Sequence, residues 1–426
     1  MRRTLRIVSA TGSVLQCRTA SSVSSRKVAE RPVVSSNFPP RHAPHTSASV
    51  APKKKILRSG LLVAASALAA IGLGSMSSSS NSGTRTGGWW VPSSDGHLED
   101  AEHKVLSVLK SDVEVSFVEL DNGHRVRTMV VNRGQFPDKE PLVLVHGFAA
   151  AIGTWAKNID ELAEKRTVYA LDQVGFGRSD RPEFSTEPDE AEEQFVENLE
   201  QWRAKMELDS FILLGHSLGG FISLSYTFKY PGFVKHLILA DPWGMAVRPV
   251  EGTEFERTYP IRYKFFSFVG ARVSPLGILR AAGPFGPGLM QRARPDLQRV
   301  FSDLYPDTTM LEYMYHCNAQ QPSGELAMKS LMSKNMGFAT NPMLERIGDV
   351  PDGLNVSFIY GERSWNDSVP GEKAREILGK SRVDVTVLPD ANHHVYGFDG
   401  FNQAVNEHCR QVDVTQSVSP HLPTCQ

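Results

Sequence analysis

Residues 211–220 read Phe-Ile-Leu-Leu-Gly-His-Ser-Leu-Gly-Gly. The apolar start of this stretch predicts a buried strand, and residues 219–229 predict a helix. Ser217 therefore falls in a sharp strand-to-helix turn, with Gly215 and Gly219 at positions where a Cβ would clash. A serine in such a turn is typical of a nucleophile, because the free N–H groups of the helix can stabilise negative charge.

The chain around this turn alternates apolar runs with helical patterns. We expect strands at 114–120, 125–131, 141–145, 167–172, 211–214, 234–240, 356–360 and 383–388, and helices at 98–109, 155–165, 192–206, 219–229 and 401–412. Alternation of this kind predicts an α/β fold, a mainly parallel sheet with helices on both faces. Residues 243–346 interrupt the alternation, and we interpret them as an inserted cap.

A serine nucleophile needs a base, and the base needs an acid that orients it. In the chain order serine, acid, histidine, each partner is expected just beyond a strand. Asp367 follows strand 356–360 and is the predicted acid, while His393 follows strand 383–388 and is the predicted base.

Other residues near these positions remain alternatives. Glu362 is a rival acid in the loop of Asp367, and Asp241, after strand 234–240, is a weaker one. His394 is a rival base, because adjacent residues point in different directions.

The negative charge that forms during acyl transfer needs two backbone donors. The N–H of Leu218, directly after the nucleophile, is one. The N–H of Phe148 is the expected second, since it follows His146-Gly147 at the end of strand 141–145. Chemistry of this kind needs no metal and no cofactor, and none is predicted.

The N-terminal residues differ in composition from the rest. Residues 1–94 hold 13 Lys and Arg but one acid, Glu30. Residues 1–58, basic and rich in Ser and Thr, predict a mitochondrial transit peptide. Residues 59–76 are uncharged and at the lower length limit for a membrane span. A Ser/Gly linker at 77–88 leads to the domain at 89–426, which begins with Trp89-Trp90, a pair suited to a membrane surface.

The remaining residues are acidic. Residues 95–426 keep 33 of the 46 basic and 46 of the 47 acidic residues, a net charge of −13. This balance argues against nucleic-acid binding, which needs a clustered positive surface. Cys17, Cys317, Cys409 and Cys425 lack metal-ligand spacing and are expected to be free thiols.

Residues 89–413 resemble one family along their length. The matching motifs are Leu142-Val-Leu-Val-His-Gly-Phe, Gly175-Phe-Gly-Arg-Ser, Leu214-Gly-His-Ser-Leu-Gly-Gly-Phe, Asp241-Pro-Trp-Gly, Tyr315-His-Cys-Asn and Gly361-Glu-Arg-Ser. The chain resembles the α/β-hydrolase domain-containing proteins four and five and is similar to the related mitochondrial cardiolipin deacylases. The resemblance implies an α/β-hydrolase fold and supports Ser217, Asp367 and His393 as the catalytic residues.

Two departures from the family pattern bear on function. Member five has Asn at the nucleophile position and is a lipase co-activator, whereas Ser217 keeps catalysis possible here. The family also shows His-x4-Asp, which is linked to a proposed lysophosphatidic acid acyltransferase activity. Here that spacing is kept only between His394 and Asp399, which weakens the acyltransferase interpretation.

The leading hypothesis is a serine hydrolase that deacylates a phospholipid or related acyl lipid, in cardiolipin or phosphatidic acid remodelling and lipid homeostasis. One alternative is a lysophosphatidic acid acyltransferase, and another is a non-enzymatic lipase co-activator or scaffold with a lipase partner. The leader favours a membrane-associated mitochondrial location, with a lipid droplet or the cytosol as alternatives. A membrane or lipid-droplet surface is the expected partner.

Overall fold

One sheet of eight strands organises the part of the chain that the computed structural model describes, residues 93–247, 276–333 and 338–418. The order is β1-β2-β4-β3-β5-β6-β7-β8. The strands are β1 (Val113–Glu119), β2 (Arg125–Val131), β3 (Leu142–Val145), β4 (Val168–Leu171), β5 (Phe211–His216), β6 (Val234–Ala240), β7 (Asn355–Gly361) and β8 (Val383–Leu388). β1 pairs antiparallel with β2, and β2 with β4, while all the other pairs are parallel. The predicted mainly parallel sheet is confirmed.

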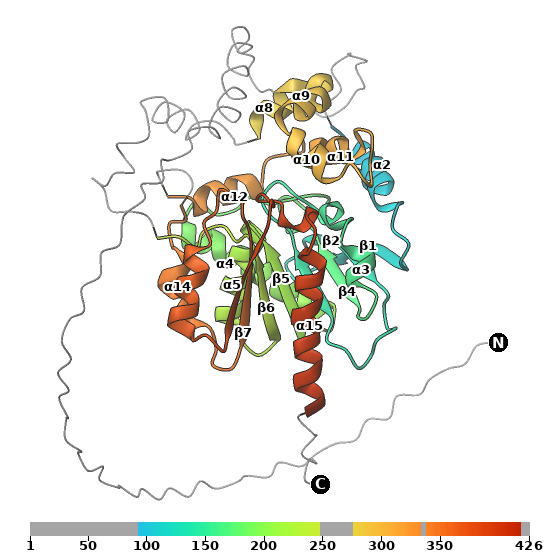
Figure 1. Cartoon of the computed structure of the whole chain (residues 1–426). Coiled ribbons are helices and arrows are strands. Elements are labelled where there is room, and N and C mark those ends of the chain that lie inside the picture. The colour runs from blue at the N-terminus through green and yellow to red at the C-terminus, as the bar shows by residue number, and fades with distance from the viewer. Residues whose placement is uncertain (1–92, 248–275, 334–337, 419–426) are drawn as a thin grey trace, which may run out of the picture. The chain divides into compact units, whose positions relative to one another are not determined.

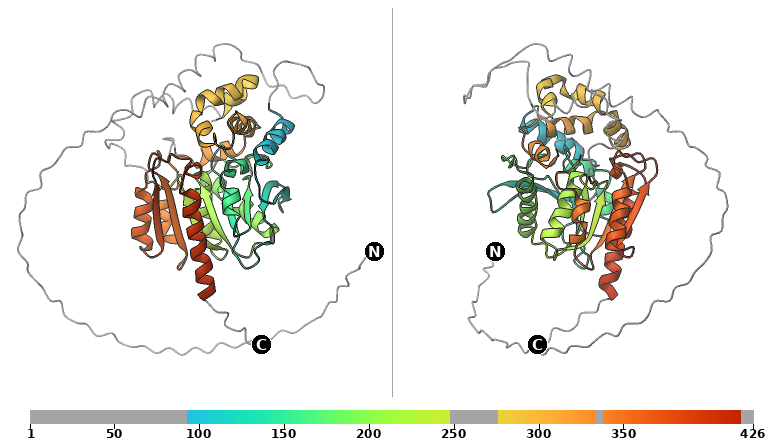
Figure 2. Two further views of the ribbon diagram at one scale, coloured as in Figure 1. Left: turned by 45° about the vertical axis from the view of Figure 1, so that its right-hand side comes forward. Right: turned by 90° about the vertical axis from the view of Figure 1, so that its left-hand side faces the viewer.

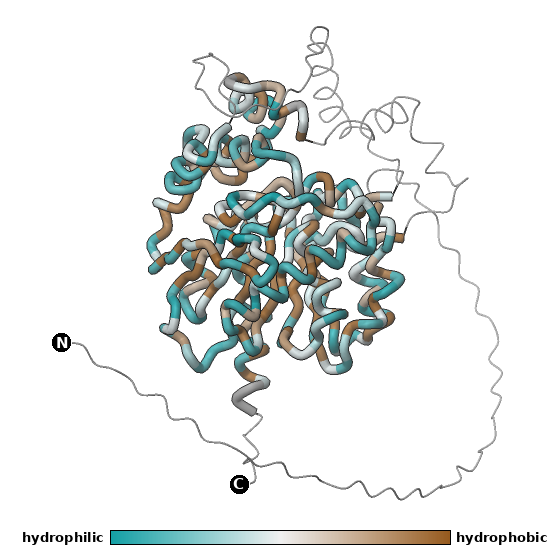
Figure 3. The backbone as a smooth tube through the Cα atoms, turned by 180° about the vertical axis from the view of Figure 1, so that it is seen from behind, coloured by the Kyte–Doolittle hydropathy of each residue, from teal (hydrophilic) through white to brown (hydrophobic). Residues whose placement is uncertain are grey.

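Helices cover both faces of the sheet (Figures 1 and 2). One apolar cluster joins the sheet to α2 (Asp95–Leu106), α3 (Ile159–Leu162) and α15 (Phe401–Val418), and a second joins it to α4 (Pro188–Lys205), α5 (Leu218–Lys229) and α14 (Val369–Leu378). Central strands such as β3 and β5 are buried along their whole length, which explains their continuous apolar sequence. Figure 3 shows hydrophobic and hydrophilic positions interleaved along the backbone of the described part of the chain.

The described chain between β6 and β7 consists of short helices joined by turns. It contains α8 (Gly277–Ala282), α9 (Gly286–Ala293), α10 (Pro295–Val300), α11 (Thr309–Asn318), α12 (Gly324–Leu331) and α13 (Met343–Arg346). These helices fall within the predicted cap, and α11 packs against α2 (Figure 1). Tyr313 of α11 also accepts a hydrogen bond from the N–H of Gly153 (3.2 Å), which links this region to the loop after β3.

Several element boundaries differ from the sequence prediction. The helix expected at 155–165 is instead a 3-10 turn, Ile152–Trp155, followed by the short α3. α4 begins at Pro188 rather than at residue 192, because proline is well suited to the first turn of a helix. α14 was not predicted. Its sequence carries Pro370 and Gly371, which lower helix propensity.

The N-terminal predictions concern residues outside the described part. The leader at 1–58, the candidate membrane segment at 59–76, the linker at 77–88 and the Trp89-Trp90 pair all lie there, so the domain boundaries remain predictions. In the described ranges no helix combines the length and apolar character needed to cross a membrane. Cys317 and Cys409 are buried free thiols, as expected.

Candidate active site

Ser217 lies at the turn between β5 and α5 with a strained backbone. Its φ of +53° and ψ of −117° are rarely adopted by residues other than glycine. Such strain is the mark of a nucleophile held in a strand-to-helix turn. Glycines allow the turn: a Cβ on Gly215 would lie 2.5 Å from Ser223 Oγ, and one on Gly219 would lie 2.5 Å from His146 O and closer still to Val145 O.

Gly219→Ala is therefore expected to abolish labelling by a serine-reactive fluorophosphonate and to lower the melting temperature. The new methyl group must push α5 away from the end of β3, at a cost of about 1–3 kcal/mol or more. Gly232→Ala is the matched control, because nothing lies within 4 Å of its added Cβ. Labelling of Gly219→Ala at the wild-type rate would contradict this account of the turn.

His393 bridges Ser217 and an acidic side chain. Its Nε2 lies 3.0 Å from Ser217 Oγ, and its Nδ1 lies 2.9 Å from Asp241 Oδ1. Because a carboxylate can only accept, Nδ1 carries the proton and Nε2 is free to accept the hydrogen of the serine hydroxyl. The three side chains form a continuous serine–histidine–aspartate line with the spacing that general-base catalysis requires.

The structure differs from the sequence prediction at the acid. Asp367 is exposed, and its Oδ1 accepts the N–H of Val369 (2.9 Å) at the start of α14. Glu362 is also exposed and accepts the N–H of Asp390 (2.9 Å). Asp241, the weaker candidate, is the carboxylate that contacts His393. The reason is geometric: Asp241 directly follows β6, the neighbour of the nucleophile strand, whereas Asp367 lies six residues beyond the end of β7.

The carboxylate of Asp241 is fully buried and held by the loop after β7. Its Oδ1 accepts hydrogen bonds from Ser364 Oγ and Asn366 Nδ2, both 2.8 Å, and its Oδ2 accepts the N–H of Gly361 (3.1 Å). Asn366 Nδ2 also donates to the Asp241 carbonyl oxygen (3.0 Å). The β7 loop thus supplies neutral donors for an acid that comes from β6.

The other histidines have structural contacts instead. His216 Nε2 donates to the carbonyl oxygen of His393 (2.8 Å), and burial holds the pKa of His216 well below its usual value. The rival base His394 accepts from Arg294 through Nε2 and donates to Tyr396 through Nδ1. Burial, reinforced by Arg294, lowers the pKa of His394 as well, so both side chains are neutral at pH 7.

The loop after β3 lies directly against the nucleophile. A Cβ on Gly147 would be 2.9 Å from Ser217 Cβ, so the backbone of this loop passes close to the serine. His146 Nε2 accepts the N–H of Gln173 (3.1 Å), which leaves its Nδ1–H to donate to Gly147 O (2.8 Å). Leu218 is the first residue of α5, where backbone N–H groups have no partner within the helix. Leu218 directly follows Ser217 and Phe148 directly follows Gly147, and their roles as oxyanion donors stay a prediction.

Asp172, at the end of β4, fixes the far side of the same loop. Its two oxygens accept the N–H groups of Ile152 (2.7 Å) and Arg178 (2.8 Å). Burial, together with the charge of Glu102, raises the pKa of Asp172 to about 7. A carboxyl group with a raised pKa takes up protons in the folded protein at pH values where the unfolded chain has released them.

The contribution of Asp172 to stability is therefore expected to fall as the pH rises from about 4 to about 7 and to level off above, while the neutral buried His216 and His394 act in the opposite direction below the ordinary histidine pKa. The slope due to Asp172 is at most about 1.4 kcal/mol per pH unit, set by one proton. Thermal or urea unfolding of wild type and Asp172→Asn at pH 5, 6, 7 and 8 measures it. The histidines contribute to both proteins, so the free energy of unfolding should change with pH more positively in Asp172→Asn, by the slope due to Asp172. Equal slopes for wild type and Asp172→Asn would contradict the raised pKa.

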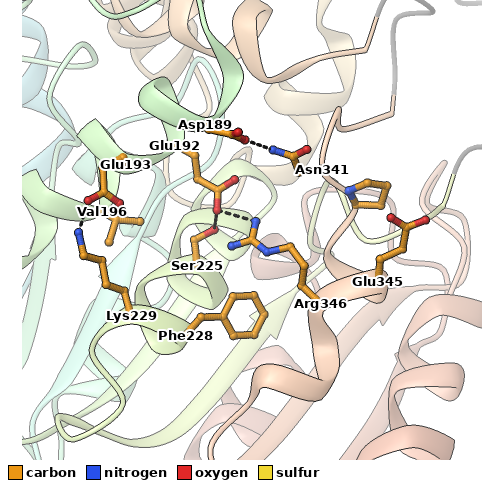
Figure 4. A pocket seen from close by; sticks show the side chains of 11 residues that line it. Asp189, Glu192, Glu193, Val196, Ser225, Phe228, Lys229, Asn341, Glu345 and Arg346 are labelled. Carbon is orange, nitrogen blue, oxygen red and sulfur yellow. Dashed lines mark hydrogen bonds and ion pairs between the residues drawn. The ribbon is translucent and has the colours of Figure 1, made fainter.

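A polar cavity lies apart from these residues, between α4, α5 and α13 (Figure 4). Its volume is about 630 Å³, and its lining includes Glu192, which accepts from Ser225 Oγ and Arg346, both at 2.7 Å. None of the residues lining it belongs to the serine–histidine–aspartate line. Its charged lining is unlike the mainly apolar pocket that an acyl chain needs.

Four residues of the site escaped the sequence analysis: His216, Ser364, Asn366 and Trp365. His216 belongs to the nucleophile motif itself, and the other three lie between Glu362 and Asp367, a loop interpreted only for its carboxylates. For Ser364 and Asn366, the available signal was a polar side chain one or two residues from a candidate acid. No group of three or more metal-ligating side chains is found among the described residues.

Comparison with known proteins shows which family the chain resembles in sequence. The profile of the alpha/beta hydrolase fold matches residues 140–273. The human (lyso)-N-acylphosphatidylethanolamine lipase is 45% identical over 74% of this chain and 92% of its own length. The mouse 1-acylglycerol-3-phosphate O-acyltransferase ABHD5 is 43% identical over 75% of this chain and 91% of its own.

Solved structures support the fold alone. The carboxylesterase CesB of Bacillus subtilis has a TM-score of 0.53 at 17% identity, covering 73% of this chain and 96% of its own. The naproxen esterase of the same organism gives 0.51 at 15% identity, covering 76% and 99%. With the fold, the serine turn and these relatives together, the chain belongs to the α/β-hydrolase family that contains the α/β-hydrolase domain-containing proteins four and five.

Proposed function

We propose that this protein is a serine hydrolase that removes an acyl chain from a phospholipid or a related acyl lipid. The observation that carries the proposal is the line from Ser217 Oγ through His393 to Asp241, with distances of 3.0 and 2.9 Å. A scaffold needs neither a strained serine nor a base within hydrogen-bond reach of it.

The reaction proceeds through an acyl-enzyme. Ser217 Oγ forms a bond to the ester carbonyl carbon while its proton passes to His393 Nε2. The N–H groups of Leu218 and Phe148 hold the negative oxygen, and Asp241 stabilises the imidazolium. The bond to the leaving alcohol then breaks, and the alcohol takes the proton from His393. Water, deprotonated by His393, releases the fatty acid and restores Ser217.

The lipid substrate class rests on the relatives. One group is named for lipase activity on (lyso)-N-acylphosphatidylethanolamine, and the other for acyl transfer to 1-acylglycerol-3-phosphate. Both names describe glycerophospholipids with an acyl group gained or lost. Cardiolipin or phosphatidic acid precursors remain our proposed substrates for a protein whose basic leader favours mitochondrial import and a membrane or lipid-droplet surface.

Acyl transfer is the second candidate, supported by the name of the ABHD5 relatives. In it the acyl-enzyme or acyl-CoA would pass its acyl group to a lysophosphatidic acid hydroxyl instead of water. The His-x4-Asp pair gives this candidate little support, because Asp399 is exposed and, among the described contacts, His394 bonds to Arg294 and Tyr396 rather than to Asp399.

A panel of acyl lipids tests the proposal. Purified protein is incubated with lysophospholipids, N-acylphosphatidylethanolamine, phosphatidic acid, cardiolipin and monoacylglycerol, and released fatty acid is measured, with Ser217→Ala protein as the blank. Fatty-acid release from at least one phospholipid is expected. Release from none of them, or equal release by the blank, would contradict the hydrolase proposal. Labelled phosphatidic acid formed from acyl-CoA and lysophosphatidic acid would favour transfer.

A further inference from the structure

Trp365 is a large, exposed aromatic side chain beside the catalytic histidine. It lies in the loop after β7, and 64% of it is exposed to solvent. Tryptophan is usually well buried, because its large apolar surface is costly in water. Burial in the hydrophobic core therefore does not account for this residue.

The indole lies next to the reacting groups. Its ring centre is 4.7 Å from that of His393, with the planes tilted by 42°. The buried His216 lies 4.9 Å from the same imidazole. Since His393 Nε2 is 3.0 Å from Ser217 Oγ, Trp365 is one side chain away from the bond that changes.

The loop is fixed on both sides of Trp365. Ser364 and Asn366 both donate to Asp241 Oδ1, and the N–H of Asn366 donates to Ser364 Oγ (3.1 Å). With both neighbours directed toward the acid, the residue between them is held in place by contacts it does not make itself. These hydrogen bonds do not involve the Trp365 side chain, so they do not account for a tryptophan at this position.

We propose that Trp365 is a substrate-contacting residue, whose exposed indole forms an apolar wall for the acyl chain of the ester. This inference rests on the proposed function and specifies it, because an ester with a longer acyl chain should react faster when its chain contacts the indole. An acyl chain laid along the indole removes apolar surface of both from water. Because the loop already holds the ring in place before binding, the contact costs little conformational entropy of the protein.

Two alkyl fluorophosphonates test the wall without a known lipid substrate. One carries a dodecyl chain and the other a methyl group, and the rate constant of Ser217 labelling is measured for each with the full-length protein. Any effect of the substitution on His393 acts on both reagents and cancels in their ratio. Trp365→Ala is expected to lower the ratio of dodecyl to methyl rate constants about tenfold, equivalent to losing contact with about two methylene groups.

Two further variants make the result specific. Trp365→Phe should keep most of the ratio, because it retains an aromatic face. Ile377→Ala, which removes another exposed apolar side chain (57%) from the outer part of α14, should keep all of it. An unchanged ratio of dodecyl to methyl rate constants in Trp365→Ala would overturn the assignment of Trp365 as the acyl wall. This holds even if Trp365→Ala binds lipid vesicles less well than wild type does. Wild-type protein that reacts with neither reagent would instead overturn the proposed hydrolase function, and the wall with it.

Discussion

Replacing Asp241 by asparagine is expected to lower kcat by about 10⁴-fold while leaving the protein folded. Asparagine keeps the shape of the side chain but turns an acceptor into an amide, which holds His393 in the wrong tautomer and cannot stabilise the imidazolium. The buried carboxylate has fixed partners in Ser364, Asn366 and Gly361.

Asp367→Asn is the matched control for this substitution. It changes a carboxylate in the neighbouring loop whose contact is an exposed hydrogen bond to the N–H of Val369, which an asparagine oxygen can keep. Activity within about twofold of wild type is expected, since surface substitutions away from the site change little. Hydrolysis of a short-chain ester, with melting temperatures to check folding, measures both variants. If Asp367→Asn loses much of its hydrolytic activity while Asp241→Asn loses little, Asp367 and not Asp241 is the catalytic acid.

The nucleophile and the sheet could be predicted because both depend on patterns of neighbouring residues in the sequence. An apolar strand, a glycine-flanked serine and a helix occupy residues 211–229 without a break, and the structure has β5, Ser217 and α5 there. The missing side chain of Gly147 is what lets the β3 loop meet Ser217.

The acid could not be predicted because it depends on tertiary distance. Asp241 and Asp367 both follow parallel strands, and their strands are neighbours in the sheet. Chain order alone allows both, because each lies between Ser217 and His393 in the sequence. What decides the geometry is that Asn366 and Ser364 donate to Asp241, which requires the β7 loop to fold back over β6. A loop conformation of this kind leaves no periodic pattern in the sequence.

Ser217→Ala is expected to reduce hydrolysis by about 10⁶-fold, to the background set by the remaining oxyanion donors. The change removes one oxygen at a buried position that already tolerates the strained backbone, so the fold and lipid binding should persist. The measurement is fatty-acid release with single-turnover labelling by a fluorophosphonate, alongside vesicle binding of both proteins.

The same variant separates an enzyme from a lipase co-activator. His393 stays hydrogen-bonded to Asp241 in Ser217→Ala, and every surface available to a partner is unchanged, because Ser217 is almost completely buried. A scaffold would therefore restore lipid levels in cells that lack the protein as well as wild type does. A hydrolase would not, and its substrate should accumulate. Full rescue by Ser217→Ala would leave the strained turn, its glycines and the base 3.0 Å away without a function, and the catalytic proposal would have to be abandoned.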